Sequence, residues 1–153
     1  LLGRSYRDFH GTELPGIGLL PLDTVAGERR MIGDVLLECE LEAGERRTLA
    51  GFENHAGRTY LDDGAEPLGR VLAGFGNDGE SGEEGCRSGR VLGTYLHGPL
   101  LPRNPWLADW LIAQALAHRS GGDPPELEPL ADDLEADAHA VSAERARSRG
   151  GRF

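Results

Sequence analysis

Apolar and polar residues alternate with a period of two along several short stretches of the chain, a pattern typical of β-strands. Residues 31–41 end in this alternation, and we expect a strand there. Residues 48–53 predict a second strand, which we expect to end at the turn-prone residues 54–57. Further candidates are strands at residues 68–75 and 90–96, and a short apolar segment at residues 16–22.

Two helices are expected in the last third of the chain. Asn104 is a suitable N-cap residue and Pro105 suits the first helical position, so we expect a helix that ends at Gly121-Gly122. A second helix is expected from about residue 130 to residue 147, with one apolar face formed by Leu130, Leu134, Ala138 and Val141. Strands first and helices last indicate an α/β or α+β domain.

Residues 76–85 separate two of the expected strands and are rich in glycine and acidic residues. They offer nothing to bury, so we expect a mobile, solvated loop. Acidic residues are also calcium ligands, but their spacing here fits no calcium-binding loop.

Composition narrows the class of protein. The chain has 153 residues, enough for one domain, with a net charge of −10 and a pI near 4.9. Nucleic acid is excluded as a partner, because phosphate binding needs a clustered basic face. With no apolar run long enough to span a membrane and no signal sequence, we expect a soluble, cytoplasmic protein. The only basic cluster is expected in a disordered, solvated tail: Arg145, Arg147, Arg149 and Arg152.

His97 is the strongest candidate for chemistry. It follows an apolar run, residues 91–96, and precedes a Gly98-Pro99 break, so we expect its ring at the edge of a sheet. An imidazole there can take a proton from a thiol and return it to a leaving amine. The alternative is a buried histidine bonded to a backbone carbonyl group.

Three other residues are candidates for a pocket around His97. Arg30 precedes a strand, where a guanidinium group can bind a carboxylate through two parallel hydrogen bonds, although a lone arginine is more often a surface charge. Glu53 and His55 lie at another strand end, either as turn polarity or as a second polar wall of the same pocket. A zinc site of Glu53, His55 and His97 has no support from spacing.

The two cysteines do not supply a nucleophile. Cys39 alternates with charged residues and is expected to face the core, and Cys86 lies at the exit of the acidic loop. Neither lies on a strand–turn–helix elbow, and their separation supports neither a structural zinc site nor a disulfide framework.

Several strings of residues resemble those of class I glutamine amidotransferases of the cobyric-acid-synthase-like subgroup. The most specific are Gly51-Phe52-Glu53-Asn54-His55 and the run from Gly93 to Pro102, which includes His97. They are most similar to the glutaminase subunits of lipid II isoglutaminyl synthases. The matching stretches, which span nearly the whole chain, are residues 1–3, 16–20, 30–34, 51–59, 74–77 and 93–110.

The resemblance implies a partial three-layer, flavodoxin-like α/β domain, with residues 1–148 as its C-terminal portion and residues 149–153 as a disordered tail. In the family a cysteine directly upstream of a Leu-Leu-Gly string attacks the glutamine side chain. This chain begins with Leu1-Leu2-Gly3 and its only methionine is Met31, so we expect a fragment without the nucleophile, inactive alone.

By the same resemblance, His97 is the catalytic histidine and Arg30 binds glutamine. Ammonia passes to a Mur-ligase-like partner subunit (MurT), which amidates the D-glutamate of lipid II with ATP and Mg²⁺; this subunit itself needs no cofactor. Other class I enzymes have Pro-Glu after the histidine, and the glutamate orients the ring. Here Gly98-Pro99 follows, so the orienting group is open, with Glu53 one candidate.

Two other functions fit the same residues. One is a cobyrinate or cobyrate amidotransferase, which uses the same glutamine chemistry on a corrinoid acceptor. The other is a binding module that keeps the fold without the chemistry.

Overall fold

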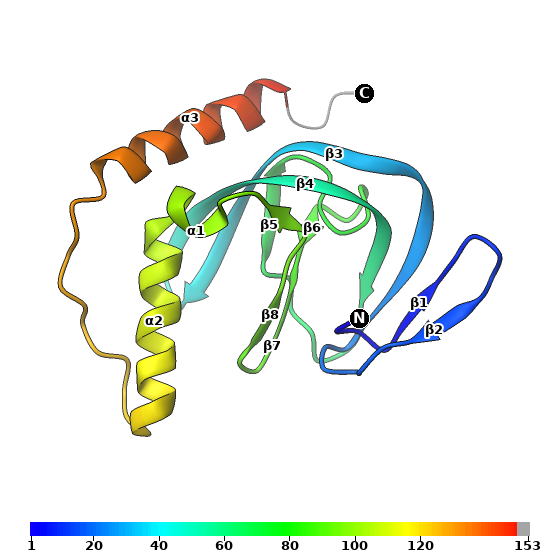
Figure 1. The fold of residues 1–153 in the computed structure, drawn as a ribbon, viewed down its shortest axis with the longest axis horizontal. Helices are drawn as coiled ribbons and strands as arrows, with labels where there is room; N and C mark the ends of the chain where they lie inside the picture. The colour runs from blue at the N-terminus through cyan, green and yellow to red at the C-terminus, as the bar shows by residue number, and fades with distance from the viewer. Residues whose placement is uncertain (150–153) are drawn as a thin grey trace.

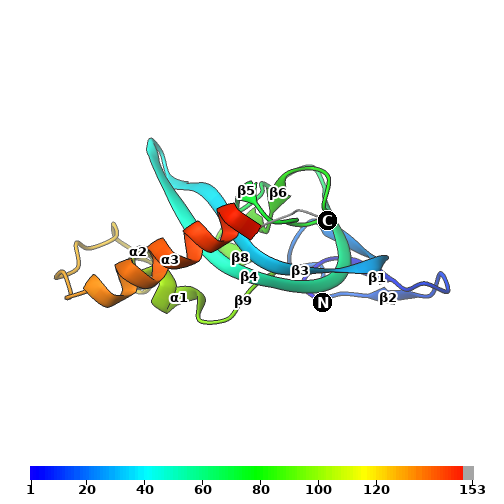
Figure 2. The same cartoon turned by 90° about the horizontal axis from the view of Figure 1, so that it is seen from above.

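Two long antiparallel strands form the centre of the structure, a computed structural model that describes residues 1–149 (Figure 1). β3 (Leu22–Glu42) and β4 (Glu45–Leu61) are joined by a turn in which Gly44 has a φ of 83°, a value that favours glycine. Their register shifts between Ala26 and Met31 and again near the turn, and the two strands curve together across the molecule (Figure 2).

The expected turn at residues 54–57 does not exist, so this prediction was wrong. β4 continues through it, with Asn54 opposite Ile32 and His55 opposite Met31. Asparagine and glycine favour turns locally, but the long partner strand offers ladder hydrogen bonds to this segment. Tertiary pairing therefore overrides local preference.

Shorter strands complete a mixed seven-stranded sheet with the order β2-β1-β3-β4-β9 along its main path. β1 (Ser5–Arg7) runs parallel to β3 and antiparallel to β2 (Glu13–Pro15), while β9 (Leu96–His97) pairs with β4. The sheet also contains β5 (Gly69–Ala73), which pairs with β3 and with β6 (Glu83–Glu84). β7 (Cys86–Ser88) and β8 (Val91–Gly93) pair with each other in a separate two-stranded hairpin.

The strand expected at residues 68–75 is therefore confirmed as β5, and the one expected at residues 90–96 is divided into β8 and β9. Together with the three helices, the mixed sheet confirms the expected α/β class, consistent with a partial class I amidotransferase domain.

Each face of the β3–β4 pair has its own cluster of buried side chains, because alternate residues of a strand point to opposite faces. On one face Leu36 and Ala50 pack against Ala143 and Ala146 of α3 (Asp133–Arg149), which lies across the strands (Figure 2). On the other face lies the larger cluster: Val35, Leu37, Cys39, Leu49, Leu68, Leu96 and Leu107. A fully buried leucine of this kind contributes about 2 kcal/mol to stability.

After the short α1 (Leu100–Arg103), α2 (Pro105–Ser120) begins and ends where the sequence predicted, but its N-terminus is built differently. Gly121 follows the helix with a φ of 72°, as expected of a C-cap, and Asn104 lies at the N-cap position. Its side chain makes no capping hydrogen bond. Instead it accepts a hydrogen bond from the Ala50 N–H and donates one to the Ala50 carbonyl, each 2.9 Å long. The Asn104 side chain thus makes the two hydrogen bonds to the β4 backbone at Ala50 that a neighbouring strand would otherwise make.

α3 lies close to the expected residues 130–147 but buries a different face. Its buried residues are Ala143 and Ala146, whose small side chains allow the helix to pack closely on the sheet. The four residues expected to form the packed face are all exposed, so that expectation was wrong: Leu130, Leu134, Ala138 and Val141.

The arginine cluster is largely helical, not a disordered tail. Arg145, Arg147 and Arg149 belong to α3, and Arg145 forms an ion pair of 3.2 Å with Asp34. The rest of the expected tail, residues 150–153, lies outside the described residues. None of the helices in the described part of the chain is long and apolar enough to cross a lipid bilayer.

Candidate active site

His97 ends β9 at the edge of the main sheet, where the sequence predicted it. Its ring is exposed, and it makes no hydrogen bond or ion pair with any residue of the described chain. The chain can leave the strand at once because Gly98 has a φ of 80°, in the left-handed region that glycine tolerates best. The imidazole is therefore available to a ligand.

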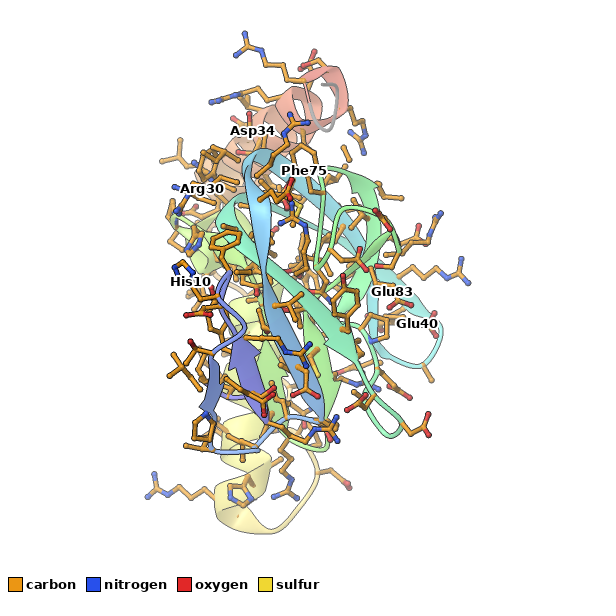
Figure 3. The ribbon with its side chains drawn as sticks, turned by 90° about the vertical axis from the view of Figure 1, so that its right-hand side faces the viewer. His10, Arg30, Asp34, Glu40, Phe75 and Glu83 are labelled. Carbon is orange, nitrogen blue, oxygen red and sulfur yellow. The ribbon has the colours of Figure 1, made fainter. Side chains whose placement is uncertain are left out.

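Register places His97 in a cross-strand row with Phe52 of β4 and Asp34 of β3. Residues directly opposite each other point to the same face of a sheet, and Asn54, two residues beyond Phe52, shares that face. Arg30 donates from Nε to Oδ1 of Asn54 at 3.0 Å and from Nη2 to its carbonyl oxygen at 3.3 Å. The structure therefore brings Arg30 and His97 to one face; Figure 3 labels Arg30 and Asp34 on β3.

Arg30 retains donors for a ligand. The residue is exposed, and its Nη1 group makes no hydrogen bond to the residues that the structure describes. Asn54 fixes the guanidinium plane from the other side. This arrangement suits a carboxylate, which accepts two parallel hydrogen bonds from a guanidinium group.

Glu53 and His55 lie on the opposite face of β4, where both are buried, so the structure does not place them beside His97. Both oxygens of the Glu53 carboxylate are occupied, by the N–H groups of Phe75 (2.7 Å) and Gly76 (2.9 Å). The structure therefore does not form a single pocket from Arg30, Glu53, His55 and His97. For the same reason Glu53 does not contact the His97 ring, and Glu53, His55 and His97 do not form a zinc site. Within residues 1–149 no group of three or more His, Cys, Asp or Glu side chains is arranged to hold a metal ion.

The His55 ring is held by its neighbours. Nδ1 donates to the Gly57 carbonyl at 3.0 Å, and the ring stacks on Tyr95 with 3.6 Å between centroids. Nε2 has no hydrogen-bond partner in the described chain and lies 3.9 Å from Glu53 Oε2. His55 thus supports the segment before His97 from the core side.

The acidic loop of residues 76–85 is ordered by buried polar groups, so the expectation of a mobile loop with nothing to bury was wrong. Asn77 exchanges two hydrogen bonds of 2.9 Å with the backbone of Gly85, and Glu84 is fully buried. Burial raises the pKa of Glu84 to about 7; hydrogen bonds from Tyr95 and Thr94 lower that pKa and nearby Glu53 raises it. Sequence reasoning missed Glu84, because nothing in the local pattern separates it from the other acidic residues of the loop, none of which is buried.

A cleft of about 190 Å³ opens beside the segment that leads to His97. Thr94 and Tyr95 form one wall, and Leu1 and Gly3 form another. The Tyr95 hydroxyl group bonds to Thr59 Oγ1 at 2.7 Å within the same wall. The first residues of the chain therefore lie beside the residues that precede His97.

Both cysteines are buried, and their surroundings disfavour the reactive thiolate form. Burial, with a smaller effect of the Glu38 charge, raises the pKa of Cys39 to about 11, and its Sγ donates to the Arg47 carbonyl at 3.5 Å. Burial also raises the pKa of Cys86. Since the thiolate is the reactive form, neither is a nucleophile at neutral pH.

Comparison with known proteins identifies what these residues resemble. Residues 1–105 match the model of the CobB/CobQ-like glutamine amidotransferase domain. The chain is 40% identical over 145 residues to the GatD subunit of lipid II isoglutaminyl synthase (glutamine-hydrolysing) from Staphylococcus aureus, covering 95% of this chain and 56% of that protein. GatD of Streptococcus pneumoniae is 40% identical over 124 residues, covering 80% of this chain and 46% of that protein.

A second group of relatives is more distant. Cobyric acid synthase of Methylorubrum populi is 34% identical over 148 residues, which cover 89% of this chain and 28% of that enzyme. The chain spans about half the length of the GatD proteins it matches.

Proposed function

The chain belongs to the CobB/CobQ-like glutamine amidotransferase family, and on that premise we propose that it is part of a subunit that hydrolyses glutamine to glutamate and ammonia. The observation that carries the proposal is the placement of an unbonded, exposed His97 on the same sheet face as Arg30. One group can transfer protons there, and the other can bind the carboxylate of an amino acid.

In the proposed reaction a cysteine thiolate attacks the side-chain amide carbon of glutamine. The C–N bond breaks, His97 protonates the departing nitrogen to give ammonia, and a thioester remains on the cysteine. His97 then takes a proton from water as the water attacks the thioester, and the C–S bond breaks to release glutamate and the cysteine thiolate. Arg30 binds the α-carboxylate through the free edge of its guanidinium group, formed by Nη1 and the second N–H of Nη2.

The nucleophile is proposed to lie outside these 153 residues, because Cys39 and Cys86 are both buried with raised pKa values. The 153-residue chain alone is therefore expected to have no glutaminase activity. Turnover that Cys39→Ala or Cys86→Ala abolishes would contradict this.

The acceptor of the ammonia is proposed to be the D-glutamate of lipid II, amidated in the cytoplasm by a Mur-ligase-like partner (MurT) with ATP and Mg²⁺. No cofactor is proposed for this subunit. The 40% identity to GatD over 95% of the chain supports this choice above the 34% identity to cobyric acid synthase. Corrinoid amidation is the second candidate, and it is decided by offering each acceptor to the purified enzyme.

The test uses the complete polypeptide that contains this segment, purified with its ligase partner. Glutamate release from glutamine is measured for the wild type and for His97→Ala, with the exposed His10 as the matched control. We expect His97→Ala to lower kcat about 100-fold or more, whereas His10→Ala leaves kcat unchanged. Arg30→Ala should raise KM for glutamine. Full activity of His97→Ala would rule out the proposed role.

A further inference from the structure

The two residues between β8 and β9, Thr94 and Tyr95, belong to no strand, so their backbone groups lack the ladder partners of a sheet. The Glu84 carboxylate takes that place. It accepts a hydrogen bond from the Tyr95 N–H at 2.6 Å and from the Thr94 hydroxyl at 2.9 and 3.0 Å to its two oxygens. Thr94 Oγ1 in turn accepts the Leu96 N–H at 3.0 Å. The three residues before His97 are thus bound to one side chain, directly or through Thr94.

The strand that carries His97 is very short, so its own sheet hydrogen bonds give it few restraints. β9 pairs with β4 only at Leu96 and His97, and the left-handed Gly98 follows immediately. A short edge strand of this kind depends on contacts outside its own ladder. The hydrogen bonds to Glu84 therefore restrain the backbone directly before His97, together with the stacking of Tyr95 on His55 and its hydrogen bond to Thr59.

Glu84 is itself rigidly placed. β6 pairs with β5 at Gly69 and Arg70, and Asn77 binds the backbone of Gly85 on the other side. Glu84 forms no ion pair with any described residue, and the charged or titratable groups that act on it are Glu53 and His55 of β4. Burial of a carboxylate without a cation is costly. The hydrogen bonds from Thr94 and Tyr95 offset part of this cost.

We propose that Glu84 is a positioning residue for His97, which holds the imidazole at the sheet edge by fixing the backbone of residues 94–96. This inference rests on the proposed glutaminase function for its kinetic consequence, but its structural part does not. The ionised carboxylate accepts the hydrogen bond from the Tyr95 N–H and the one that the Thr94 hydroxyl shares between its two oxygens, whereas the protonated form gives up part of that capacity. Because burial raises the pKa of Glu84 to about 7, the hold on residues 94–96 weakens as the pH falls below that value.

The first test measures glutamine hydrolysis by the complete polypeptide with its partner. Glu84→Gln keeps the shape but removes the charge, and the matched control is Glu83→Gln, whose side chain makes no hydrogen bond or ion pair with the described residues. We expect Glu84→Gln to lower kcat about tenfold, less than loss of the general base itself, with KM for glutamine unchanged. The acidic limb of the wild-type pH–rate profile should include the ionisation of Glu84, and this ionisation should be absent from the profile of Glu84→Gln.

Thr94 provides variants that leave Glu84 in place. Thr94→Ser keeps the hydroxyl that links Glu84 to the Leu96 N–H, and Thr94→Val removes it at nearly equal volume. We expect Thr94→Ser to behave as wild type and Thr94→Val as Glu84→Gln. If Glu84→Gln does not fold, the Thr94 pair decides the question.

The second test does not need activity. In the complete polypeptide with ¹³C-labelled histidine, the signal of His97 is assigned by its loss in His97→Ala. We expect Glu84→Gln and Thr94→Val to shift this signal and Glu83→Gln to leave it unchanged. If the wild type hydrolyses no glutamine, the proposed function fails while this test still decides the positioning role. Wild-type kcat and an unshifted His97 signal in both variants would overturn the inference.

Discussion

Replacement of Asn104 by aspartate separates two possible roles of this residue at the start of α2. Aspartate is among the best N-cap residues and has nearly the volume of asparagine, so a capping role predicts little change in stability. In the structure, Asn104 Nδ2 donates to the carbonyl groups of Ala50 at 2.9 Å and Leu100 at 2.7 Å. A carboxylate cannot donate, so Asn104→Asp places an oxygen against two carbonyl oxygens.

The size of the effect follows from burial. Asn104 is completely buried, so water cannot replace the lost donor. A buried acceptor left without a hydrogen bond costs about 1–3 kcal/mol; the Ala50 carbonyl is in a buried hydrogen bond and the Leu100 carbonyl in a partly buried one. Burial of the new charge adds to this cost. We therefore expect Asn104→Asp to lower the free energy of unfolding at pH 7 by roughly 4 kcal/mol, a large part of the about 5–15 kcal/mol typical of a domain.

Urea denaturation of the complete polypeptide, followed by circular dichroism, measures this difference. Asn104→Ser tests the same point, because serine is a good N-cap residue but lacks the amide donor, and it should also be strongly destabilised. The exposed Asn54→Asp is the control and should change stability by no more than about 0.5 kcal/mol. An Asn104→Asp variant as stable as the wild type would show that capping, not pairing with Ala50, is what this position requires.

Three further predictions concern stability and reactivity. The pKa of Glu84 is raised from 4.5 to about 7 because the cost of burying its charge exceeds what the hydrogen bonds from Tyr95 and Thr94 return. The folded chain therefore has its full stability below pH 4.5 and loses part of it as the pH rises through 7. This amounts to about 3 kcal/mol, and urea denaturation at pH 5 and pH 8 should show that pH dependence in the wild type and not in Glu84→Gln. Gly98→Ala should cost about 1–2 kcal/mol through backbone strain alone, because the nearest atom to the added Cβ is 3.9 Å away; in the same denaturation assay the control, Gly33→Ala, should lose no stability. Cys39 and Cys86 should react with a disulfide reagent only after denaturation, and rapid labelling of either in the folded chain would contradict the buried, protonated state described here.

The sequence was most informative where a local rule and the tertiary structure agree. Asn104-Pro105 and Gly121 mark the ends of α2 because a proline at the first position and a left-handed glycine after the last one are requirements of the helix itself. The apolar run before Gly98 placed His97 at a sheet edge for a similar reason, since the turn needs the glycine and the strand needs the apolar residues.

The sequence was misleading where contacts between residues far apart in the chain determine the secondary structure or the burial of a residue. Asn54 and His55 have the preferences of a turn, but β3 is long enough to pair with them. Leu134 has the preferences of a buried helix face, but the sheet accepts only the alanines of α3 at close range. Glu84 lies in a segment with the composition of a solvated loop. Its burial is explained by the N–H group of Tyr95, eleven residues later, which has no strand partner and donates to the Glu84 carboxylate.

The packing of α3 has a consequence for the face that carries His97. Arg145 of this helix bonds to Asp34, the first member of the row that continues through Phe52 to His97. Ala143 and Ala146 set the close approach of the helix to the strands, so a bulkier side chain at either position would separate the two layers and disturb the ion pair between Arg145 and Asp34. A substitution in a helix remote in sequence can therefore reach the sheet face that carries His97 without touching His97 or Arg30.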